Sequence, residues 1–592
     1  MTRKVSRGVT AFVALSVSVL ATSVSVQAGA AEVPPLIDAV KQGDAATVRT
    51  LIDQGVDVSA TEVDGTTALH WAAHLGDATA AALLIDAGVD PKAITRNGAT
   101  AYALACSKGH PEVIALFLEA GADPNAVITG EPAIMKVARA GNPAAVRVLL
   151  AAGGDPNVTE PDRGQTALMW AASAGNVEAV KVLLEFGADI DARSTVPDPP
   201  PGLGPGRIPR VNDPLGLRAH RDPDWSQNRS GMRFTPIMWA VREGHMDVVK
   251  VLLDDDFHVA ADVNDEKPGV GTTNLILAII NRHYELAAYL LERGADPNAG
   301  PGYTALHQVA WSRRLNKKFG PRNPEATGTM GGLELAKLLI EHDVDINARM
   351  TRSFEDGYRN RMIRIGATAF LLSSKLVDLP MMKLLVESGA DIHIKNVDAE
   401  GANDSALMLA AGVAILNPGG EDAGSEEEVL EAVQYLLDLG FDPNERNNNG
   451  EASLHGAAYR GYNKVAQLLL NHGAELGVEN ILGWKPVTVA DGLFFAGFFK
   501  SQPQMAAFLR EAYAERGLTP PDPPAVNDTS LLTVAARFKV GDVVKGIEGS
   551  TSGRDFAAVD DPDAAAADEA LFQVTEVDAQ GQIMATAPYT GE

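Results

Sequence analysis

Apolar residues recur along most of the chain in two alternating patterns. The first is a short phrase that appears as Gly-Thr-Thr-Ala-Leu-His-Trp-Ala-Ala from Gly65 and as Gly-Gln-Thr-Ala-Leu-Met-Trp-Ala-Ala from Gly164. The second places apolar residues at i, i+3 and i+4, as at Val180, Leu183 and Leu184, and ends in Gly-Ala-Asp. Each pattern predicts an amphipathic helix, and the pair returns about every 33 residues, a period typical of a stacked solenoid.

Hydroxyl, proline and glycine residues indicate where these helices begin and end. Pro236 and Pro486 occupy first helical positions, where the missing N–H costs nothing. The first helix of several units is expected to be capped by the hydroxyl of Thr67, Thr100, Thr166, Thr273, Thr304 or Thr368. It is expected to end in a left-handed glycine at Gly76, Gly109, Gly141, Gly175 or Gly244.

In these motifs the sequence resembles the ankyrin-repeat family over residues 34–516. The resemblance implies a mainly α fold, a solenoid of about twelve helix-turn-helix units with projecting β-finger loops and degenerate units at both ends. Four stretches exceed the repeat length and are predicted to be insertions, namely 196–232, 313–331, 351–365 and 413–428. Two of them, 196–232 and 351–365, should lengthen fingers, and the other two should lie between the helices of a unit.

Three of these insertions carry most of the clustered positive charge of the chain. Sixteen basic and seven acidic residues lie in or beside these three insertions, whereas the fourth insertion is acidic. Guanidinium groups pair bidentately with carboxylate or phosphate, so these loops are candidates for binding a partner or an anion. The candidate residues are Arg207, Arg210, Arg218, Arg221, Arg229, Arg313, Arg314, Lys317, Lys318, Arg352, Arg359, Arg361 and Arg364. The alternative is that they fold back onto acidic groups of their own repeats.

Composition narrows the class of protein further. The 592 residues carry a net charge of −27, with 77 acidic and 50 basic residues, which argues against a nucleic-acid binder. A single cysteine, Cys106, excludes an intrachain disulfide and a multi-cysteine zinc site. No uninterrupted apolar segment after the N-terminus is long enough for a membrane span.

The N-terminus has the pattern of a secretory signal peptide. Arg3, Lys4 and Arg7 precede an apolar stretch from Val9 to Val26, and small residues follow at Ala28. Cleavage after Ala28 would remove residues 1–28 and send the protein to the periplasm or the medium. Several Ser and Thr residues dilute the stretch, which argues against a membrane anchor.

Residues that often carry chemistry have structural interpretations here. His70, His307 and His455 occupy the histidine of the family motif, where the ring bonds backbone of a neighbouring repeat, and Cys106 replaces a buried alanine. Trp71, Trp170 and Trp239 recur at one repeat position and predict a packed column, with an aromatic binding ladder as the alternative. Common motifs for nucleotide binding, metalloprotease chemistry and serine hydrolysis are absent from the sequence. No catalytic residue, metal ligand or cofactor site is assigned.

A different composition begins after Arg516. Residues 517–529 include Pro-Pro-Asp-Pro-Pro and predict a stiff linker. Residues 530–592 predict a small acidic module, β-rich or partly disordered, with strands near 537–545, 571–577 and 583–587. A module of this size is marginal alone, so it is expected to dock on the last repeats or to remain loosely ordered.

Two classes of function agree with these features. The favoured one is a monomeric, non-catalytic, exported scaffold that binds a folded protein through the family's concave groove and fingers. The candidate groove residues are His74, Lys108, Arg139, Arg242, Tyr459 and Arg460. The alternative is a receptor for an anionic polysaccharide, lipid headgroup or metabolite, centred on the arginine-rich insertions.

Overall fold

A computed structural model shows a chain built of helix pairs. It describes residues 33–195, 233–254, 260–267, 271–314, 326–354, 362, 364–396, 402–415, 424–495 and 498–523, and the strands 543–546, 556–558, 571–577 and 583–588. The predicted signal peptide and the insertion 196–232 lie outside the described residues. Residues up to Ala122 and residues from Asp123 form two compact units.

The first unit contains three helix pairs. Their helices are α1 (Pro35–Lys41), α2 (Ala45–Asp53), α3 (Ala68–Leu75), α4 (Ala78–Asp86), α5 (Ala101–Lys108) and α6 (Pro111–Glu119). The first helix of each pair is short and buries small residues such as Ala72, Ala73 and Ala105, which lets neighbouring helices approach closely. The second helix buries larger side chains, including Leu84, Ile114 and Phe117.

The second unit continues the same design through nine further pairs. Its helices are α7 (Ala133–Ala140), α8 (Pro143–Ala151), α9 (Ala167–Ser173), α10 (Val177–Glu185), α11 (Pro236–Glu243), α12 (Met246–Leu253), α13 (Asn274–Ile280), α14 (Tyr284–Glu292), α15 (Ala305–Ser312), α16 (Gly332–Glu341), α17 (Ala369–Lys375), α18 (Leu379–Glu387), α19 (Ala406–Ala411), α20 (Glu426–Asp438), α21 (Ser453–Arg460), α22 (Asn463–Asn471), α23 (Pro486–Asp491) and α24 (Pro503–Glu515). The described residues thus contain the twelve helix pairs that the repeat length predicts.

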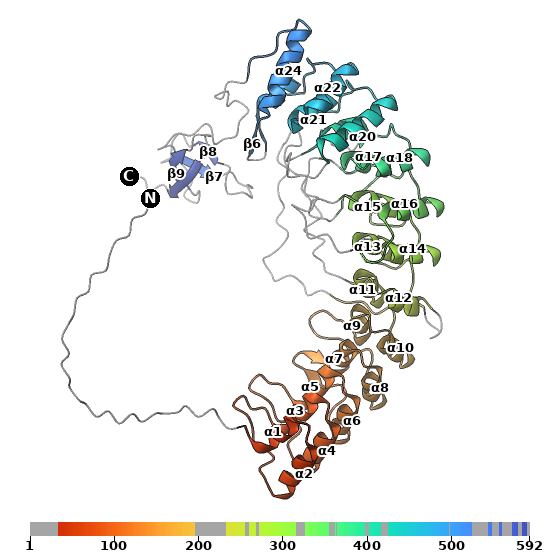
Figure 1. Cartoon of the computed structure of the whole chain (residues 1–592), viewed down its shortest axis with the longest axis vertical. Helices are drawn as coiled ribbons and strands as arrows, with labels where there is room; N and C mark the ends of the chain where they lie inside the picture. The colour runs from red at the N-terminus through yellow and green to blue at the C-terminus, as the bar shows by residue number, and fades with distance from the viewer. Residues whose placement is uncertain are drawn as a thin grey trace, which may run out of the picture. The chain divides into compact units, whose positions relative to one another are not determined.

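Helices of each unit stack in two layers, as the series from α7 to α24 shows (Figure 1). First helices pack on first helices, for example α9 on α11 and α13 on α15, and second helices pack on second helices, for example α8 on α10. The apolar core lies between the layers, so each repeat buries its apolar surface mainly against its neighbours.

Five of the six expected threonine caps, all but that of Thr304, are present and have a local physical cause. The Thr67 hydroxyl accepts from the His70 N–H at 3.3 Å and the Thr100 hydroxyl accepts from the Ala103 N–H at 3.1 Å, so each satisfies an orphan donor of the first turn. Gly76 ends α3 with a φ of 77°. A Cβ at Gly76 would also lie 2.6 Å from the His110 Nδ1. Glycine therefore lets the next repeat's His110 reach the His74 carbonyl, at 3.2 Å.

Asparagines of the Asp-x-Asn phrase join successive loops. The Asn157 side chain donates to the Gly187 carbonyl at 3.0 Å and accepts from the Asp189 N–H at 2.7 Å. Asn264 and Asn444 make the same pair of hydrogen bonds to the backbone of the following repeat. These bonds satisfy backbone groups that the turn leaves unpaired and fix the spacing between repeats.

The strands are short hairpins and one small sheet. The hairpins are β1 (Val127–Ile128) with β2 (Glu131–Pro132), β3 (Glu266–Lys267) with β4 (Thr272–Thr273), and β5 (Leu493–Phe495) with β6 (Phe498–Lys500). The C-terminal sheet contains β7 (Val543–Gly546), β8 (Phe556–Ala558), β9 (Leu571–Val577) and β10 (Ile583–Pro588) in the order β10-β9-β7-β8, all antiparallel. The strand β8 is not among the three that the sequence predicts, because its three residues carry too little alternation to be recognised.

The ends of the insertions differ slightly from those that the repeat length predicts. The segment between α15 and α16 begins at Arg313, as expected, and ends before Gly332. The acidic stretch at 413–428 is shorter than expected, because α20 begins at Glu426. Ser425 caps that helix by accepting from the Glu428 N–H at 3.3 Å, and the Glu428 carboxylate accepts in return from the Ser425 N–H at 2.9 Å.

Candidate functional site

Only four of the thirteen arginine and lysine candidates belong to the described residues. Nine of them belong to segments outside the described residues, namely Arg207, Arg210, Arg218, Arg221, Arg229, Lys317, Lys318, Arg359 and Arg361. The remaining four are Arg313, Arg314, Arg352 and Arg364. The contacts of these four residues show which groups of the chain lie against the described arginines.

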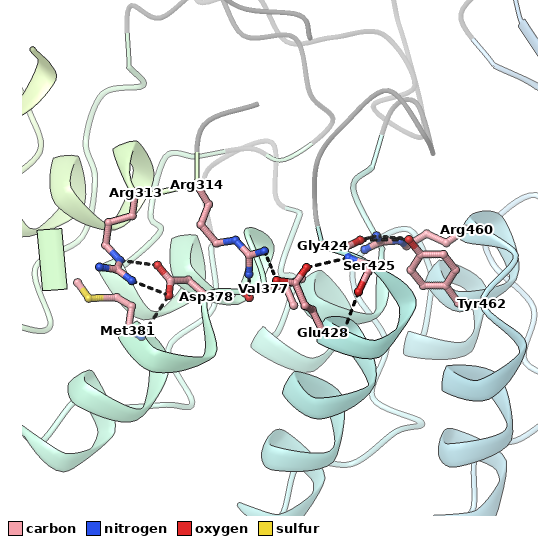
Figure 2. A network of polar contacts seen from close by, with 10 residues as sticks. All are labelled: Arg313, Arg314, Val377, Asp378, Met381, Gly424, Ser425, Glu428, Arg460 and Tyr462. Atoms are coloured by element: carbon pink, nitrogen blue, oxygen red, sulfur yellow. Dashed lines mark hydrogen bonds and ion pairs between the residues drawn. The ribbon is translucent and has the colours of Figure 1, made fainter. Parts of the chain in front are cut away.

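Arg313 and Arg314 directly follow α15 and reach across to the next two repeats (Figure 2). Arg313 donates through Nε and a terminal nitrogen to the two oxygens of Asp378, at 2.6 and 3.2 Å. Asp378 is 1% exposed and also accepts from the Met381 N–H as the cap of α18. Arg314 donates to the Val377 carbonyl and, at 2.6 Å, to Glu428 on α20. These two guanidinium groups therefore join three consecutive repeats.

Arg364 is buried, although a residue that binds an external anion needs an accessible guanidinium. It is 7% exposed, and its guanidinium carbon lies 4.8 Å from the centre of the Trp311 ring and 5.4 Å from that of Phe354. Trp311 and Phe354 in turn stack on each other at 5.5 Å. Arg352, which precedes Phe354 by two residues, is half-buried. The charge of Arg364 thus helps to pack the loop after α16 against α15.

Two candidate groove residues on α21 are covered in the structure. Tyr459 is 4% exposed and Arg460 is 7% exposed, so neither presents a surface to a partner. Arg460 donates to the Gly424 carbonyl at 2.9 Å and stacks on Tyr462, whose hydroxyl donates to the same carbonyl at 3.1 Å (Figure 2). The sequence places both residues at groove positions because it does not show that the loop before α20 reaches this far.

The other groove candidates remain accessible. Lys108 is exposed at the end of α5 and His74 is half-buried on α3, with its ring edge against Trp71 at 5.8 Å. In the second unit the side chains of Arg139 and Arg242 are 48% and 37% exposed. Both lie in the last turn of a first helix, where positive charge is favoured by the helix dipole.

Each of the three recurring tryptophans has a cation close to its ring. Lys41 Nζ lies 4.3 Å from the ring centre of Trp71, the guanidinium carbon of Arg139 lies 4.6 Å from that of Trp170, and that of Arg242 lies 5.3 Å from that of Trp239. Trp239 also packs edge-on against Phe234. Packing and cation–π contact are therefore combined at one repeated position.

Only at Trp71 does a described carboxylate complete this arrangement. Glu62 accepts from the Trp71 indole N–H at 2.8 Å and from Lys41 at 2.6 Å. These hydrogen bonds, with that from Lys41 first, lower the pKa of Glu62. Sequence reasoning missed both Glu62 and Lys41, because nothing in their local pattern indicates that they meet at Trp71.

The motif histidines have the structural role that the sequence predicts. The His307 Nδ1 accepts from the Thr304 N–H at 3.2 Å, which places the proton on Nε2, and Nε2 donates to the Ala367 carbonyl at 3.2 Å. His70 and His455 bond the carbonyls of Ala99 and Trp484 in the same way. Burial lowers the pKa of His307 to about 4 and lowers that of His70 and His455 as well. These rings are neutral connectors between repeats.

Other features of the described segments are structural. Cys106 is fully buried in α5. Across the ranges that the structure describes, His, Cys, Asp and Glu form no cluster able to hold a metal ion. Nor does any helix there reach the length and apolarity that a bilayer crossing requires.

The geometry above defines a class: stacked helical repeats in two layers, whose first helices in each unit carry cations and aromatic rings. A family model described as ankyrin repeats, in three copies, matches residues 36–128, 126–194, 215–300 and 370–480, more than half of the chain. The chain belongs to the ankyrin-repeat family. The unmatched residues 301–369 still contain the helices α15 and α16 of a regular pair.

Relatives share the repeats rather than a whole architecture. The chain is 32% identical to mouse ankyrin repeat and SOCS box protein 16 over 107 residues, 18% of this chain and 21% of that protein. It is 29% identical to the human protein of that name over 238 residues, 37% of this chain and 47% of the relative. It is 30% identical to the chicken nuclear factor NF-kappa-B p105 subunit over 268 residues, 45% of this chain and 22% of that one. The chain therefore spans less than half the length of these relatives.

One solved structure among the matches is the ankyrin repeat domain of human ASB11. It is 25% identical, with a TM-score of 0.34, and the match covers 44% of this chain and 99% of that one.

Proposed function

We propose that this protein is a non-catalytic scaffold that is exported across the inner membrane and binds a folded partner protein through its first helices and β-fingers. Ankyrin repeats are protein-interaction modules, which gives the general class. The observation that carries the proposal is that each unit keeps accessible cations at the ends of its first helices, Lys108 in the first unit and Arg139 and Arg242 in the second. Exposed polar side chains on a rigid layer are suited to recognition of one defined surface.

The described arginines do not support the anion-receptor alternative. Arg313, Arg314 and Arg364 are held by Asp378, by Glu428 and by the ring of Trp311. Charge that is already compensated within the chain contributes little to the binding of an external anion. The described arginines therefore favour the alternative in which the loops are attached to their own repeats.

A crosslinking capture from the periplasmic fraction tests the scaffold. The bait is the full chain, and the comparison is a variant that reverses charge on the first helices, His74→Glu with Lys108→Glu. We expect recovery of the partner to fall at least about tenfold, because like charge is placed in the recognised surface. The matched control is Arg49→Glu, which changes an exposed residue of the second helix α2. Equal recovery from all three baits would contradict the proposal.

Export and oligomeric state have separate measurements. If residues 1–28 are a signal peptide, the mass of the protein recovered from the periplasm will correspond to a chain that begins at Gly29. Light scattering on that material should give the mass of a monomer. A periplasm without the protein, or a chain that keeps its first 28 residues, would contradict export.

A further inference from the structure

Two β-fingers of this chain contain the dipeptide Asn-Gly at the same place in their turn. Asn97-Gly98 lies between α4 and α5, and Asn449-Gly450 lies between α20 and α21. In both the glycine has a left-handed φ, 75° and 73°. Its N–H donates to the carbonyl three residues earlier, that of Thr95 at 2.8 Å and that of Asn447 at 2.9 Å. The two sites therefore share their dipeptide and their turn.

Asparagine followed by glycine is open to a covalent reaction that needs only water. The backbone nitrogen of the glycine gives its proton to solvent and attacks the side-chain amide carbon, Cγ, of the asparagine. A five-membered succinimide ring forms as the C–N bond of the amide breaks, and ammonia leaves with a proton from solvent. Water then opens the ring to aspartate or isoaspartate, so one water is consumed and one ammonia released. Glycine favours the reaction because it has no Cβ to hinder the approach.

The turn around Asn449 is held on both sides of the reacting peptide bond. The Gly450 N–H bonds the Asn447 carbonyl, and on the opposite side the Asn449 carbonyl accepts from the Ile481 N–H of the next repeat at 2.9 Å. The Asn449 N–H also donates to Asn447 Oδ1 at 3.0 Å. Gly450 is half-buried, and a Cβ at this position would lie 3.0 Å from the Cα of Asn480. The Gly450 nitrogen therefore cannot turn toward the Asn449 side chain unless the contact with the next repeat opens.

The corresponding peptide bond at Asn97 is held on one side. Arg96, one residue earlier, donates its N–H to the Asp64 carbonyl of the preceding finger at 2.7 Å. The Gly98 N–H bonds Thr95, but within the described ranges no hydrogen bond reaches the Asn97 carbonyl or its side chain. Both Asn97 and Gly98 are exposed, and a Cβ at Gly98 would meet no atom within 4 Å. Rotation of this peptide bond toward the Asn97 side chain therefore breaks a single hydrogen bond.

We propose that Asn97 is a site of spontaneous deamidation in the folded protein, and that the contact of Asn449 with the next repeat slows the same reaction there. The reactive geometry at Asn449 requires the loss of one more hydrogen bond than at Asn97, which corresponds to a rate at least about fivefold lower. The product places a negative charge beside Arg96 and, as isoaspartate, lengthens the main chain by one methylene group. This inference goes beyond the proposed function, because it concerns the chemistry of one finger with or without a partner.

Peptide mass spectrometry of the full chain provides the first test. The protein is kept at pH 8, where solvent base accelerates the reaction, both folded and in concentrated urea. Samples are digested at intervals, and the mass gain from amide to acid is followed in the peptides that contain Asn97 and Asn449. In the folded protein we expect Asn97 to convert at least about fivefold faster than Asn449, since one additional hydrogen bond protects the latter. In urea the two sites should convert at similar rates, because the contacts that distinguish them are lost.

Three results would overturn the inference. Equal rates in the folded protein would show that the Ile481 contact gives no protection. An unmodified Asn97 over the time that converts both sites in urea would show that the bond to Thr95 is sufficient to prevent the reaction. The same ratio of rates with and without urea would attribute the difference to neighbouring residues instead of the fold.

Substitutions and the identity of the product provide the second test. Asn97→Gln keeps an amide but would have to form a six-membered ring, so the mass gain at this position should disappear. The matched variant Asn449→Gln should leave conversion at Asn97 unchanged. Chromatography should resolve two products of equal mass, aspartate and isoaspartate, which mark the succinimide. A mass gain that persists in Asn97→Gln, or aspartate as the single product, would contradict the proposed reaction. Partner capture does not enter these experiments, so the scaffold proposal stands or fails separately.

Discussion

The repeats from α15 to α21 and those from α7 to α11 use similar basic residues in opposite ways. Near α15 the chain supplies the counter-charge itself, since Asp378 holds Arg313 and Glu428 holds Arg314. Near α7 to α11, Arg139 and Arg242 lie beside indole rings, with Glu131 3.6 Å from Arg139 and Glu243 3.5 Å from Arg242. The cation at Arg313 is therefore held by a buried carboxylate of the next repeat, whereas the cations at Arg139 and Arg242 lie beside aromatic rings.

Burial accounts for this difference. Asp378 is 1% exposed, and Arg313 can satisfy it with two parallel bonds, so each group depends on the other. The Arg139 side chain is half exposed and can exchange its partners with water. In the region from α15 to α21, the loss of one charge is expected to lower the free energy of unfolding. In the region from α7 to α11, the same loss should leave stability nearly unchanged and weaken the binding of a partner.

The largest expected effect is that of Asp378→Ala. The substitution leaves the Arg313 guanidinium without its counter-charge and removes the cap of α18, so we expect the free energy of unfolding of α17 and α18 to fall by about 4 kcal/mol. Hydrogen exchange of the amides of these helices measures it. The control is Asp77→Ala, which removes a cap of the same kind on α4 and should cost about 1 kcal/mol. Equal losses would show that the ion pair adds nothing.

Acidification separates the two regions next. Burial lowers the pKa of His307 in the folded chain to about 4, from an ordinary value of 6.5. Between pH 6.5 and 4 the histidine is therefore protonated in the unfolded chain and neutral in the folded chain. Stability of the repeat of α15 is complete above pH 6.5 and falls by about 3 kcal/mol by pH 4. In α7 and α9 the same motif position holds Met135 and Met169, so those repeats lack this cause of acid sensitivity.

Hydrogen exchange between pH 7 and 4 follows this prediction. Amides of α15 should lose protection, and His307→Gln should make that protection less dependent on pH. Equal loss of protection in α9 and α15 would contradict a role for the histidine and remove this distinction between the regions.

A pair of tryptophan variants compares a satisfied indole with an unsatisfied one. Trp71→Phe removes the hydrogen bond to Glu62, so we expect a loss of about 1 kcal/mol in the free energy of unfolding. Trp170→Phe removes a donor that has no partner, so it should cost less. Urea denaturation followed by circular dichroism measures both. A greater cost for Trp170→Phe would mean that its indole N–H is satisfied within the chain.

The smallest expected effect belongs to the more exposed ion pair of Arg314 and Glu428. Its loss in Glu428→Gln should cost about 0.5 kcal/mol at low salt, and 1 M NaCl should cancel most of that cost. Arg139→Gln should change stability by less. The comparison uses thermal unfolding at two salt concentrations, and a salt-independent cost would place Glu428 among the buried pairs.

Much of the fold follows from the sequence because its causes are local. The Thr67 cap acts on a backbone N–H three residues away, and the left-handed Gly76 directly follows the last residue of its helix. Apolar spacing at i, i+3 and i+4 identifies the second helices for the same reason. The histidine connectors could also be predicted, since the repeat itself places each ring beside the next backbone.

The candidate site was only partly predictable. Arg139 and Arg242 could be named as groove residues, but Arg364, Tyr459 and Arg460 are covered by segments whose path no local pattern shows. The contact between Arg314 and Glu428 joins residues 114 positions apart, across insertions of irregular length. Repeat spacing does not say which cation meets which carboxylate there.

The sequence by itself therefore determined the repeats, their caps and the two-layer stack, because helix periodicity and capping depend on residues within a turn or two. Only the tertiary structure decided which charged side chains form ion pairs within the molecule. Glu62 reaches Trp71 and Lys41, and Asp378 reaches Arg313, whereas Glu160, at the repeat position of Glu62, accepts from backbone N–H groups of its own turn. Side-chain pairing depends on distances of a few ångströms across repeats, and only folding sets these distances.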